Sequence, residues 1–367
     1  MTIKPAIRHE AEQLFAAFQR AGAVSVDADI LLPAETLLDL YGEDIRARAY
    51  TTTDPLRGEM MLRPDFTVPV VQAHMAHGAD PARYTYLGEV FRKQDHLGPR
   101  ASEYLQVGYE VFDRAAPEAA DAEVFALFSQ ILAPLGLRAA TGDIGILMAA
   151  VQGLSTTPRR KTALLRHIWR PRRFRMLLDR FSGRVPVPEA RALLLQRLAS
   201  DTPEALMQAA GNFIGLRSPE DIAGRATALL ADAASAPITA PEAAILEDLL
   251  ALCAPATLAL DQLHSLAQAM PAIAPAVGRF ATRLAALADR GIDVTRLPFE
   301  ASHGRSTLEY YDGFVFSFHA ADPALPPVAS GGRYDALTAV LGRGRSIPAV
   351  GGVIRPGLVV ALKRGLA

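Results

Sequence analysis

The feature that most limits the possible folds is the distribution of strand-like and helical segments along the chain. Strand-like segments, rich in β-branched and aromatic residues, occur in residues 1–150 and again in residues 291–367. Residues 151–290 are rich in Ala and Leu, and their apolar residues recur at helical spacing between Pro-containing breaks. Because strands and helices are segregated instead of alternating, the sequence predicts an α+β fold and not a doubly wound βαβ sheet. We expect residues 1–150 and 291–367 to form the core, with residues 151–290 as an all-helical insertion.

Two neighbouring segments in the first half of the chain have strand composition. They are YTYLGEVFR and EYLQVGYEVF, and the polar stretch KQDHLGPRAS joins them. This arrangement predicts a β-hairpin with a long loop. The later segment STLEYYDGFVFSF, residues 306–318, also predicts a strand, whose period-two spacing puts Tyr310 and the phenylalanines on one face and Tyr311 on the other.

The composition argues against several classes of protein. The 38 basic and 39 acidic side chains nearly cancel, so net charge favours neither a nucleic-acid partner nor a membrane surface. Cys253 is the only cysteine, which excludes an internal disulfide and a cysteine-based metal site, and its apolar segment predicts that it is buried. The sequence contains neither an apolar run of about 18 residues nor the apolar core of a signal peptide. We therefore expect a cytoplasmic protein.

Polar residues with strand spacing occur in the segment MLRPDFTVP. Arg63, Asp65 and Thr67 alternate, so on an extended segment all three would share one face. A carboxylate beside a hydroxyl can receive an ammonium group, because both offer hydrogen-bond acceptors. A surface strand with an Arg–Asp ion pair explains the same residues, so both interpretations stay open.

A second polar group lies in the predicted hairpin. Gln106 and Glu110 are four residues apart and would share a strand face, with Gly108 leaving room between them. Arg92, at the end of the neighbouring strand, could hold a carboxylate or phosphate bidentately. A polar, solvated sheet face is the alternative. Farther along, SGGRYDAL offers two glycines that permit close approach of the backbone to a ligand, although such glycines are also common in turns.

The order of these segments resembles the catalytic domain of histidyl-tRNA synthetase, a class II aminoacyl-tRNA synthetase. The matching segments are MLRPDFTVPV, YLGEVFRKQ, YLQVGYEVF, LEYYDGFVF and SGGRYDAL. The resemblance covers the N-terminal half and the C-terminal quarter of the chain, and the middle matches only as a helical insertion. It implies an antiparallel sheet flanked by helices, in a fold that is usually dimeric.

The resemblance also implies a histidine-binding pocket. The residues at the matching positions are Asp65, Thr67, Arg92, Gln106, Glu110, Tyr311 and Tyr334. In this assignment Asp65, replacing a Glu of the family, and Thr67 hold the α-ammonium group. Glu110 accepts from an imidazole N–H, the two tyrosines contact the ring, and Arg92 meets the carboxylate.

The sequence departs from the family where the synthetases carry catalytic arginines. Residues 306–309 replace an Arg-Gly-Leu-Asp type segment, and Arg305 is one residue out of step, which on a strand turns its side chain to the opposite face. Leu358 occupies the position of an ATP-binding arginine, and Arg355 falls where the last helix should begin. Because adenylate formation depends on positioned positive charge, these changes predict that aminoacylation is lost and that no residue is catalytic.

Two smaller departures point the same way. Near Arg100, which is kept, Ser102 replaces a second basic residue that the family carries. The chain ends nine residues after Leu358, so we expect no anticodon-binding domain.

This profile resembles the histidyl-tRNA synthetase paralogues that are regulatory subunits of ATP phosphoribosyltransferase. The resemblance implies a non-catalytic subunit for the first step of histidine biosynthesis, which forms a homodimer within a hetero-oligomer containing a short-form catalytic subunit. It implies L-histidine as a ligand, in this pocket or at a subunit interface, and no cofactor, metal, membrane or nucleic-acid partner. Two rivals remain: an enzyme that activates histidine for a non-tRNA acceptor using Arg305 or Arg355, and a free-standing histidine- or RNA-binding module.

The run RRKTALLRHIWRPRRFR is the one strong charge cluster of the sequence. Residues 159–184 contain ten Lys or Arg residues and a single acidic residue, Asp179. Trp169 could stack on an RNA base, the run could meet an acidic partner, or it could be a solvated helix surface. His74 and His77 lie three residues apart on a predicted helix, but no third ligand is nearby, so we predict no metal site.

Overall fold

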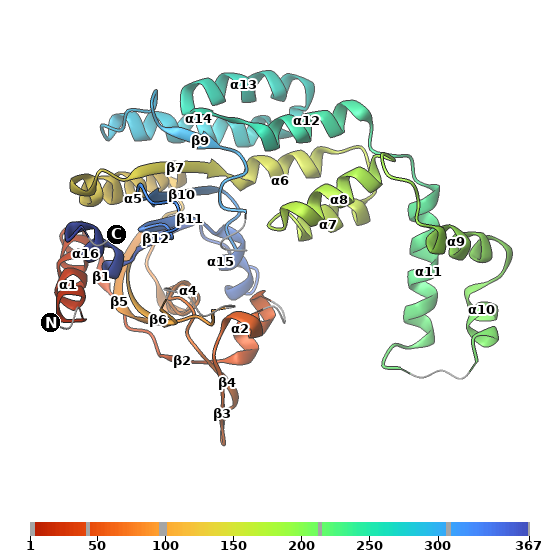
Figure 1. Cartoon of the computed structure of the whole chain (residues 1–367), viewed down its shortest axis with the longest axis horizontal. Coiled ribbons are helices and arrows are strands. Elements are labelled where there is room, and N and C mark those ends of the chain that lie inside the picture. The colour runs from red at the N-terminus through yellow and green to blue at the C-terminus, as the bar shows by residue number, and fades with distance from the viewer. Residues whose placement is uncertain (1–3, 42–44, 95–100, 212–214, 306–309, 366–367) are drawn as a thin grey trace.

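The protein is described by a computed structural model in which a large mixed sheet carries helices on both faces (Figure 1). The described residues are 4–41, 45–94, 101–211, 215–305 and 310–365. The strands of the large sheet follow the order β1-β5-β6-β12-β11-β10-β7-β9-β8. Their bounds are β1 (Val24–Ser25), β5 (Ala82–Phe91), β6 (Glu103–Phe112), β7 (Arg138–Asp143), β8 (Cys253–Pro255), β9 (Pro298–Glu300), β10 (Phe314–His319), β11 (Ala329–Arg333) and β12 (Ala349–Ile354).

Most neighbouring strands of this sheet are antiparallel, as the sequence predicts for an α+β fold. Only β1 with β5 and β7 with β9 run parallel. The predicted hairpin is confirmed: β5 and β6 pair from Ala82 opposite Phe112 to Phe91 opposite Glu103. A second, three-stranded sheet has the order β2-β4-β3, with β2 (Leu31–Pro33), β3 (Thr51–Asp54) and β4 (Gly58–Leu62).

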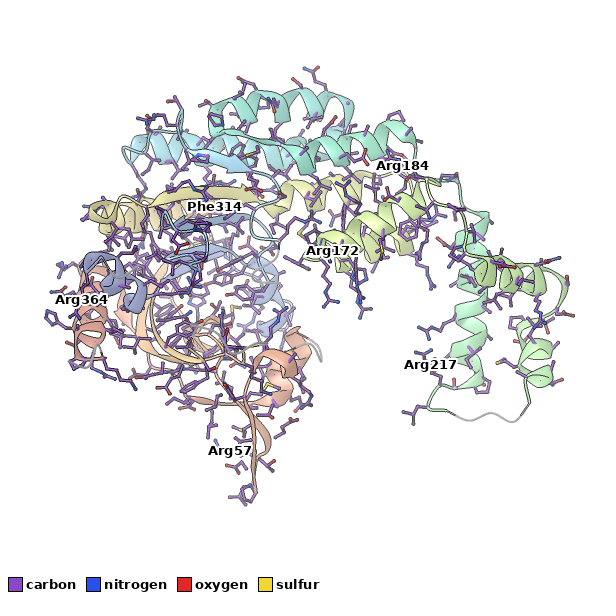
Figure 2. The ribbon with its side chains drawn as sticks, in the orientation of Figure 1. Arg57, Arg172, Arg184, Arg217, Phe314 and Arg364 are labelled. Atoms are coloured by element: carbon purple, nitrogen blue, oxygen red, sulfur yellow. The ribbon has the colours of Figure 1, made fainter. Side chains whose placement is uncertain are left out.

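Helices α1 (Lys4–Arg20), α5 (Pro117–Leu132) and α16 (Pro356–Lys363) pack on one face of the large sheet. Apolar residues at helical spacing on α5, including Phe125 and Phe128, contact the rings of Phe314 and Phe316 on β10. Figure 2 shows Phe314 within the body of the protein. The alternating phenylalanines of β10 therefore form the core, as their spacing predicts.

The remaining helices lie near the opposite face, pack on α5 as α14 does, or lie beyond the sheet. Near the opposite face are α2 (Ala34–Tyr41), α3 (Ile45–Arg48), α4 (Thr67–His77) and α15 (Asp335–Leu341). The middle of the chain forms α6 (Ile144–Gly153), α7 (Pro158–Arg166), α8 (Pro171–Phe181), α9 (Glu189–Ser200), α10 (Pro203–Ala209), α11 (Pro219–Ala234), α12 (Ala240–Ala251), α13 (Ala256–Ala269) and α14 (Ala274–Asp289), with 3-10 turns η1 (Ala133–Leu135) and η2 (Pro271–Ile273). Figure 1 shows α9, α10 and α11 projecting away from the body.

Helix starts in this middle region follow local sequence signals. A capping box joins Ser218 to Asp221 at the start of α11, and another joins Thr239 to Glu242 at the start of α12. A proline occupies the first turn of both helices, where its missing N–H has no intrahelical partner to lose. None of the helices in the described part combines the length and the apolar composition that crossing a bilayer requires.

Three local expectations from the sequence are wrong. The middle region is not entirely helical, because β8 lies within residues 151–290 and pairs with β9 at the edge of the large sheet. Cys253 is exposed, since this short edge strand does not bury it. Tyr310 to Gly313 precede strand β10, which begins at Phe314, because Asp312 accepts backbone N–H groups of Asp335 and Ala336 and so turns the chain.

A buried charge network ties the helices to the sheet. Asp121, on α5 and fully buried, accepts from Arg333 Nη2 at 2.7 Å and from Arg283 Nη1 at 3.1 Å. Arg283, on α14, also pairs with Asp143 at the end of β7. Arg333 has a second carboxylate partner, Asp335, at 3.0 Å. The Asp121 carboxylate is therefore shared by two guanidinium groups that come from different elements.

We expect Asp121→Asn to lower the free energy of unfolding by about 3 kcal/mol, because it removes the buried charge that Arg283 and Arg333 share and leaves each of them with one carboxylate partner, Asp143 or Asp335. Urea denaturation followed by circular dichroism measures the change. The matched control, Asp289→Asn, alters an exposed carboxylate at the end of α14 and should change stability by less than about 0.5 kcal/mol. Equal unfolding midpoints for the two variants would contradict the importance of this network.

Candidate functional site

A small cavity lies on the sheet face opposite α5. All seven residues that the sequence resemblance assigns to a ligand pocket line this cavity: Asp65, Thr67, Arg92, Gln106, Glu110, Tyr311 and Tyr334. Its other lining residues are Tyr310, Ser330, Gly351, Gly352, Val353 and Arg355. The pocket thus joins segments that are far apart in the sequence.

Strands β6 and β12 form the floor of the pocket. The alternation along β6 points Tyr109 toward α1, where it contacts Phe18, and points Gln106 and Glu110 to the pocket. Gly351 on β12 lies opposite Glu110, and a Cβ there would lie 1.4 Å from Glu110 Oε2. Because Gly351 has no side chain, the Glu110 carboxylate can lie over the backbone of β12 at this position.

The expectation that Gly108 leaves room for a ligand is wrong. A Cβ at Gly108 would lie 2.1 Å from Cζ of the Tyr86 ring, which fills this space from the neighbouring strand β5. Tyr86 uses the position to donate a hydrogen bond from its hydroxyl to Glu110 Oε1 at 2.8 Å. The glycine serves the pocket indirectly, because it admits the tyrosine that holds the carboxylate.

Glu110 is a buried carboxylate held by two hydroxyl groups. Tyr86 donates to one oxygen, and Tyr334 donates to the other at 2.5 Å. Burial raises the pKa of Glu110 to about 7, and the hydroxyl groups of the two tyrosines oppose this rise. A carboxylate oxygen can accept more than one hydrogen bond, and each Glu110 oxygen accepts one from a tyrosine, so Glu110 keeps acceptor capacity for a ligand N–H.

Gln106 is the most unusual polar group of the pocket. Its side chain is 1% exposed, and among the described residues neither its Oε1 nor its Nε2 has a hydrogen-bond partner. Burying an unpaired amide costs about 1–3 kcal/mol, so a native fold keeps one only for a reason. A ligand that both donates to and accepts from this amide would supply the missing bonds.

Asp65 and Thr67 reach the pocket from the start of α4. The Thr67 N–H donates to Asp65 Oδ1 at 3.2 Å, and Thr67 Oγ1 lies 3.2 Å from the Tyr310 hydroxyl. Burial raises the pKa of Asp65, and the positive charge of Arg92 opposes this rise. A carboxylate and a hydroxyl thus meet at one side of the cavity.

Arg63 does not share their face, contrary to the expectation from its spacing. The chain turns into α4 at Thr67, so the segment is not an extended strand. The Arg63 guanidinium instead donates to the Glu89 carbonyl at 2.8 Å and lies 4.0 Å from the centre of the Phe66 ring. Arg63 therefore joins α4 to β5 and lies outside the cavity lining.

Two arginines stand at the rim. Arg92 Nε donates to the Pro64 carbonyl at 2.9 Å, and its Nη2 lies 4.0 Å from Asp65 Oδ2. Arg355, at the end of β12, donates from Nη1 to the Pro327 carbonyl at 2.6 Å. Both side chains are partly exposed, so a ligand could reach them from solvent.

Sequence reasoning missed Tyr310 and Arg355 as pocket residues. Reading residues 306–318 as one strand put Tyr310 and Tyr311 on opposite faces, but both precede β10, and both line the cavity. The signal that could have identified Arg355 is its two-residue spacing from Gly351 and Val353 on one strand face. That signal becomes useful only once β12 is known to pair with β6.

Arg305 does not line this pocket. Its Nε donates to the Ile168 carbonyl at 2.7 Å, and its guanidinium lies over the Phe174 ring at 5.0 Å. The side chain therefore packs against α8. The predicted departures at residues 306–309 and the retained Arg100 lie outside the described residues.

The cavity is narrow in this conformation. Its volume is about 20 Å³, which is room for one water-sized group. An amino acid would enter only if side chains at the rim moved, and Arg92, Tyr310 and Arg355 are the partly exposed candidates. The pocket therefore has the polar groups of a ligand site but is in a closed state.

The other sequence signals lead to no second site. His74 stacks on Phe112 with ring centroids 3.8 Å apart, and no group of three metal-ligating side chains occurs within the described ranges. In the basic run, α8 buries Phe174, Leu178 and Phe181 and exposes its arginines. Arg172 extends outward from this helix (Figure 2), which fits all three interpretations of the run.

Comparisons with known proteins agree on one family. The model of the histidyl-tRNA synthetase family matches residues 5–239 and 220–356. Relatives named ATP phosphoribosyltransferase regulatory subunit occur in Allorhizobium ampelinum, with 32% identity over 91% of this chain and 92% of the relative. Those of Mesorhizobium japonicum and Sinorhizobium medicae are 33% and 34% identical, over 95% and 93% of this chain and 94% and 93% of their own lengths.

Solved structures show the same fold. An ATP phosphoribosyltransferase regulatory subunit/histidyl-tRNA synthetase from Bacillus halodurans superposes with a TM-score of 0.68 at 19% identity, covering 98% of this chain and 79% of that protein. The histidyl-tRNA synthetase of Nostoc sp. PCC 7120 gives a TM-score of 0.64 at 17% identity, covering 99% of this chain and 73% of that protein. These similarities confirm a fold like that of the class II synthetases.

The raised pKa of Glu110 predicts a pH-dependent stability. Between about pH 4.5, where the carboxyl ionises in the unfolded chain, and about pH 7, the folded state binds more protons. The free energy of unfolding should therefore fall by about 3 kcal/mol as pH rises through this window, and Glu110→Gln should abolish that part of the slope.

Urea denaturation at several pH values between 4.5 and 8 measures this slope for both proteins. The control Glu35→Gln changes an exposed carboxylate on α2 and should keep the wild-type slope. Parallel pH profiles for wild type and Glu110→Gln would show that folding does not raise the pKa of Glu110.

Proposed function

The chain belongs to the histidyl-tRNA synthetase family and, within it, to the ATP phosphoribosyltransferase regulatory subunits, and from this we propose that it activates a short-form catalytic subunit and binds the feedback inhibitor L-histidine. Its role is in histidine biosynthesis, as a regulatory and not a catalytic subunit. The observation that carries the proposal is the agreement of the relatives, which share this name across more than 90% of both chains.

The polar groups of the pocket suit L-histidine. The Asp65 carboxylate and the Thr67 hydroxyl can receive the α-ammonium group. Glu110, which retains acceptor capacity, can receive an imidazole N–H, and Tyr311 and Tyr334 flank the space for the ring. A bound histidine would also supply hydrogen-bond partners for the buried amide of Gln106. These contacts support a histidine site in the pocket, in preference to a site at a subunit interface.

The placement of cations supports a non-catalytic pocket. Activating a carboxylate with ATP needs positive charge directed at the reacting phosphate. Arg305, the nearest candidate in sequence to the lost catalytic arginine, packs on α8 and does not line the cavity. Of the two replacement arginines that the rival function invokes, Arg305 and Arg355, only Arg355 therefore lines the cavity, together with Arg92.

Feedback requires that histidine bind two states of the assembly with different affinities. The closed pocket, with a volume of about 20 Å³, supplies one such state. We propose that histidine binds a wider state of this pocket, and that the assembly in this state has an inhibited catalytic subunit. In this proposal the chain forms a homodimer within the hetero-oligomer, without nucleic acid. Residues 1–150 and 291–367 are its core, and residues 151–290 are the insertion.

Reconstitution tests the proposal directly. The purified chain should co-purify with a short-form ATP phosphoribosyltransferase and raise its rate, and added L-histidine should inhibit the complex. An unchanged rate with the catalytic subunit would overturn the proposal. Histidine-dependent pyrophosphate exchange above background, by the chain alone, would favour the synthetase-like rival instead.

Gln106→Leu should separate ligand binding from stability. The change removes a buried amide that has no protein partner, so the free protein should be as stable as wild type or more stable. Its affinity for L-histidine should fall by about ten-fold, because two ligand hydrogen bonds are lost. Isothermal titration calorimetry and urea denaturation measure the two effects.

Gln19→Leu is the matched control, because Gln19 is exposed on α1. It should leave histidine affinity unchanged. Unaltered histidine affinity in Gln106→Leu would move the histidine site out of this pocket.

A further inference from the structure

Arg355 lies beside Gln106 on the pocket face of the sheet. Strands β12 and β6 pair antiparallel, with Ile354 opposite Val107, so continuing the register by one residue brings Arg355 level with Gln106. Residues at opposed positions of neighbouring strands project to the same face. The Arg355 N–H donates to the Val328 carbonyl at 2.9 Å, which fixes the backbone at this point.

The two arginines of the pocket differ in whether a carboxylate lies nearby. Arg92 is 4.0 Å from Asp65, so it has a carboxylate nearby. Arg355 bonds to the Pro327 carbonyl, and no carboxylate of the described residues forms an ion pair with it. The other carboxylate of the pocket, Glu110, is held by the hydroxyl groups of two tyrosines. An anion is therefore missing beside Arg355.

We propose that Arg355 binds the carboxylate of the ligand, whereas Arg92 positions Asp65 for the ligand's ammonium group. This inference rests on the proposed function, because it takes an amino acid as the ligand of this pocket. It differs from the assignment that the family resemblance gives, in which Arg92 meets the carboxylate. Two observations favour Arg355 over Arg92 as the partner of the ligand carboxylate. Arg92 already has the Pro64 carbonyl and Asp65 as partners, and Arg355 has only neutral partners.

The chemistry of the site fits a carboxylate. A guanidinium group presents two parallel N–H donors that match the two oxygens of a carboxylate. The Gln106 amide, beside Arg355, has an unused N–H donor for the same group. Burial and the nearby charge of Arg92 both lower the pKa of Arg355, and a bound carboxylate would offset both effects.

The test compares L-histidine with histamine, which keeps the ammonium group and the imidazole but lacks the carboxylate. Calorimetry with Arg355→Gln should show an L-histidine affinity lower by on the order of 10- to 100-fold, and a histamine affinity equal to that of wild type. Arg364→Gln, which alters an exposed arginine just after α16, should change neither affinity. Arg355→Lys keeps the positive charge but not the forked geometry, so its affinity for L-histidine should lie between those of wild type and Arg355→Gln.

A second ligand keeps the test decisive if histamine binds too weakly to measure. Imidazolepropionate keeps the carboxylate and lacks the ammonium group, so Arg355→Gln should lower its affinity and Asp65→Asn should not. If wild type binds L-histidine and Arg355→Gln binds it equally well, or loses both histidine and histamine to the same extent, this inference is wrong and the proposed function stands. If wild type binds none of these ligands, both are wrong.

Discussion

The buried carboxylate of Asp121 is the interaction on which the pocket and the helical layer both depend. It pairs with both Arg283 of α14 and Arg333 of β11, so it connects the helices on one face to a central strand of the sheet. Tyr334 follows Arg333 directly, and its hydroxyl reaches Glu110 on the opposite face. Because successive residues leave a strand end toward opposite sides, fixing Arg333 on one side also fixes Tyr334 on the other.

The polar groups of the pocket lower the stability of the free protein. The Glu110 carboxylate is buried with neutral partners, so burial opposes its ionisation, and the Gln106 amide has no protein partner among the described residues. An apolar pair of similar shape at these two positions would avoid both penalties. Buried polar groups that lower stability without a structural benefit are expected at functional sites. Glu110 and Gln106 are two such groups, and both line the same cavity.

The sequence allowed the prediction of features that depend on local spacing and on segment order. The hairpin followed from two strand-like segments with a polar connection, and the seven assigned residues meet in one cavity. Features that depend on pairing between distant segments could not be predicted. Arg355 enters the pocket only because β12 pairs with β6, and Cys253 is exposed because β8 joins the sheet edge beside β9.

The pocket also links elements that could move against one another. Thr67 belongs to α4, Tyr310 to the turn before β10, and Arg355 to the end of β12, yet all three line a space of about 20 Å³. A ligand larger than a water molecule needs movement of side chains at the rim, where Arg92, Tyr310 and Arg355 are partly exposed. The Thr67–Tyr310 contact joins residues 243 positions apart, so opening it would separate the start of α4 from the turn before β10. A ligand shifts such an equilibrium only by its difference in affinity for the two states, and a pocket too small in one state makes that difference large.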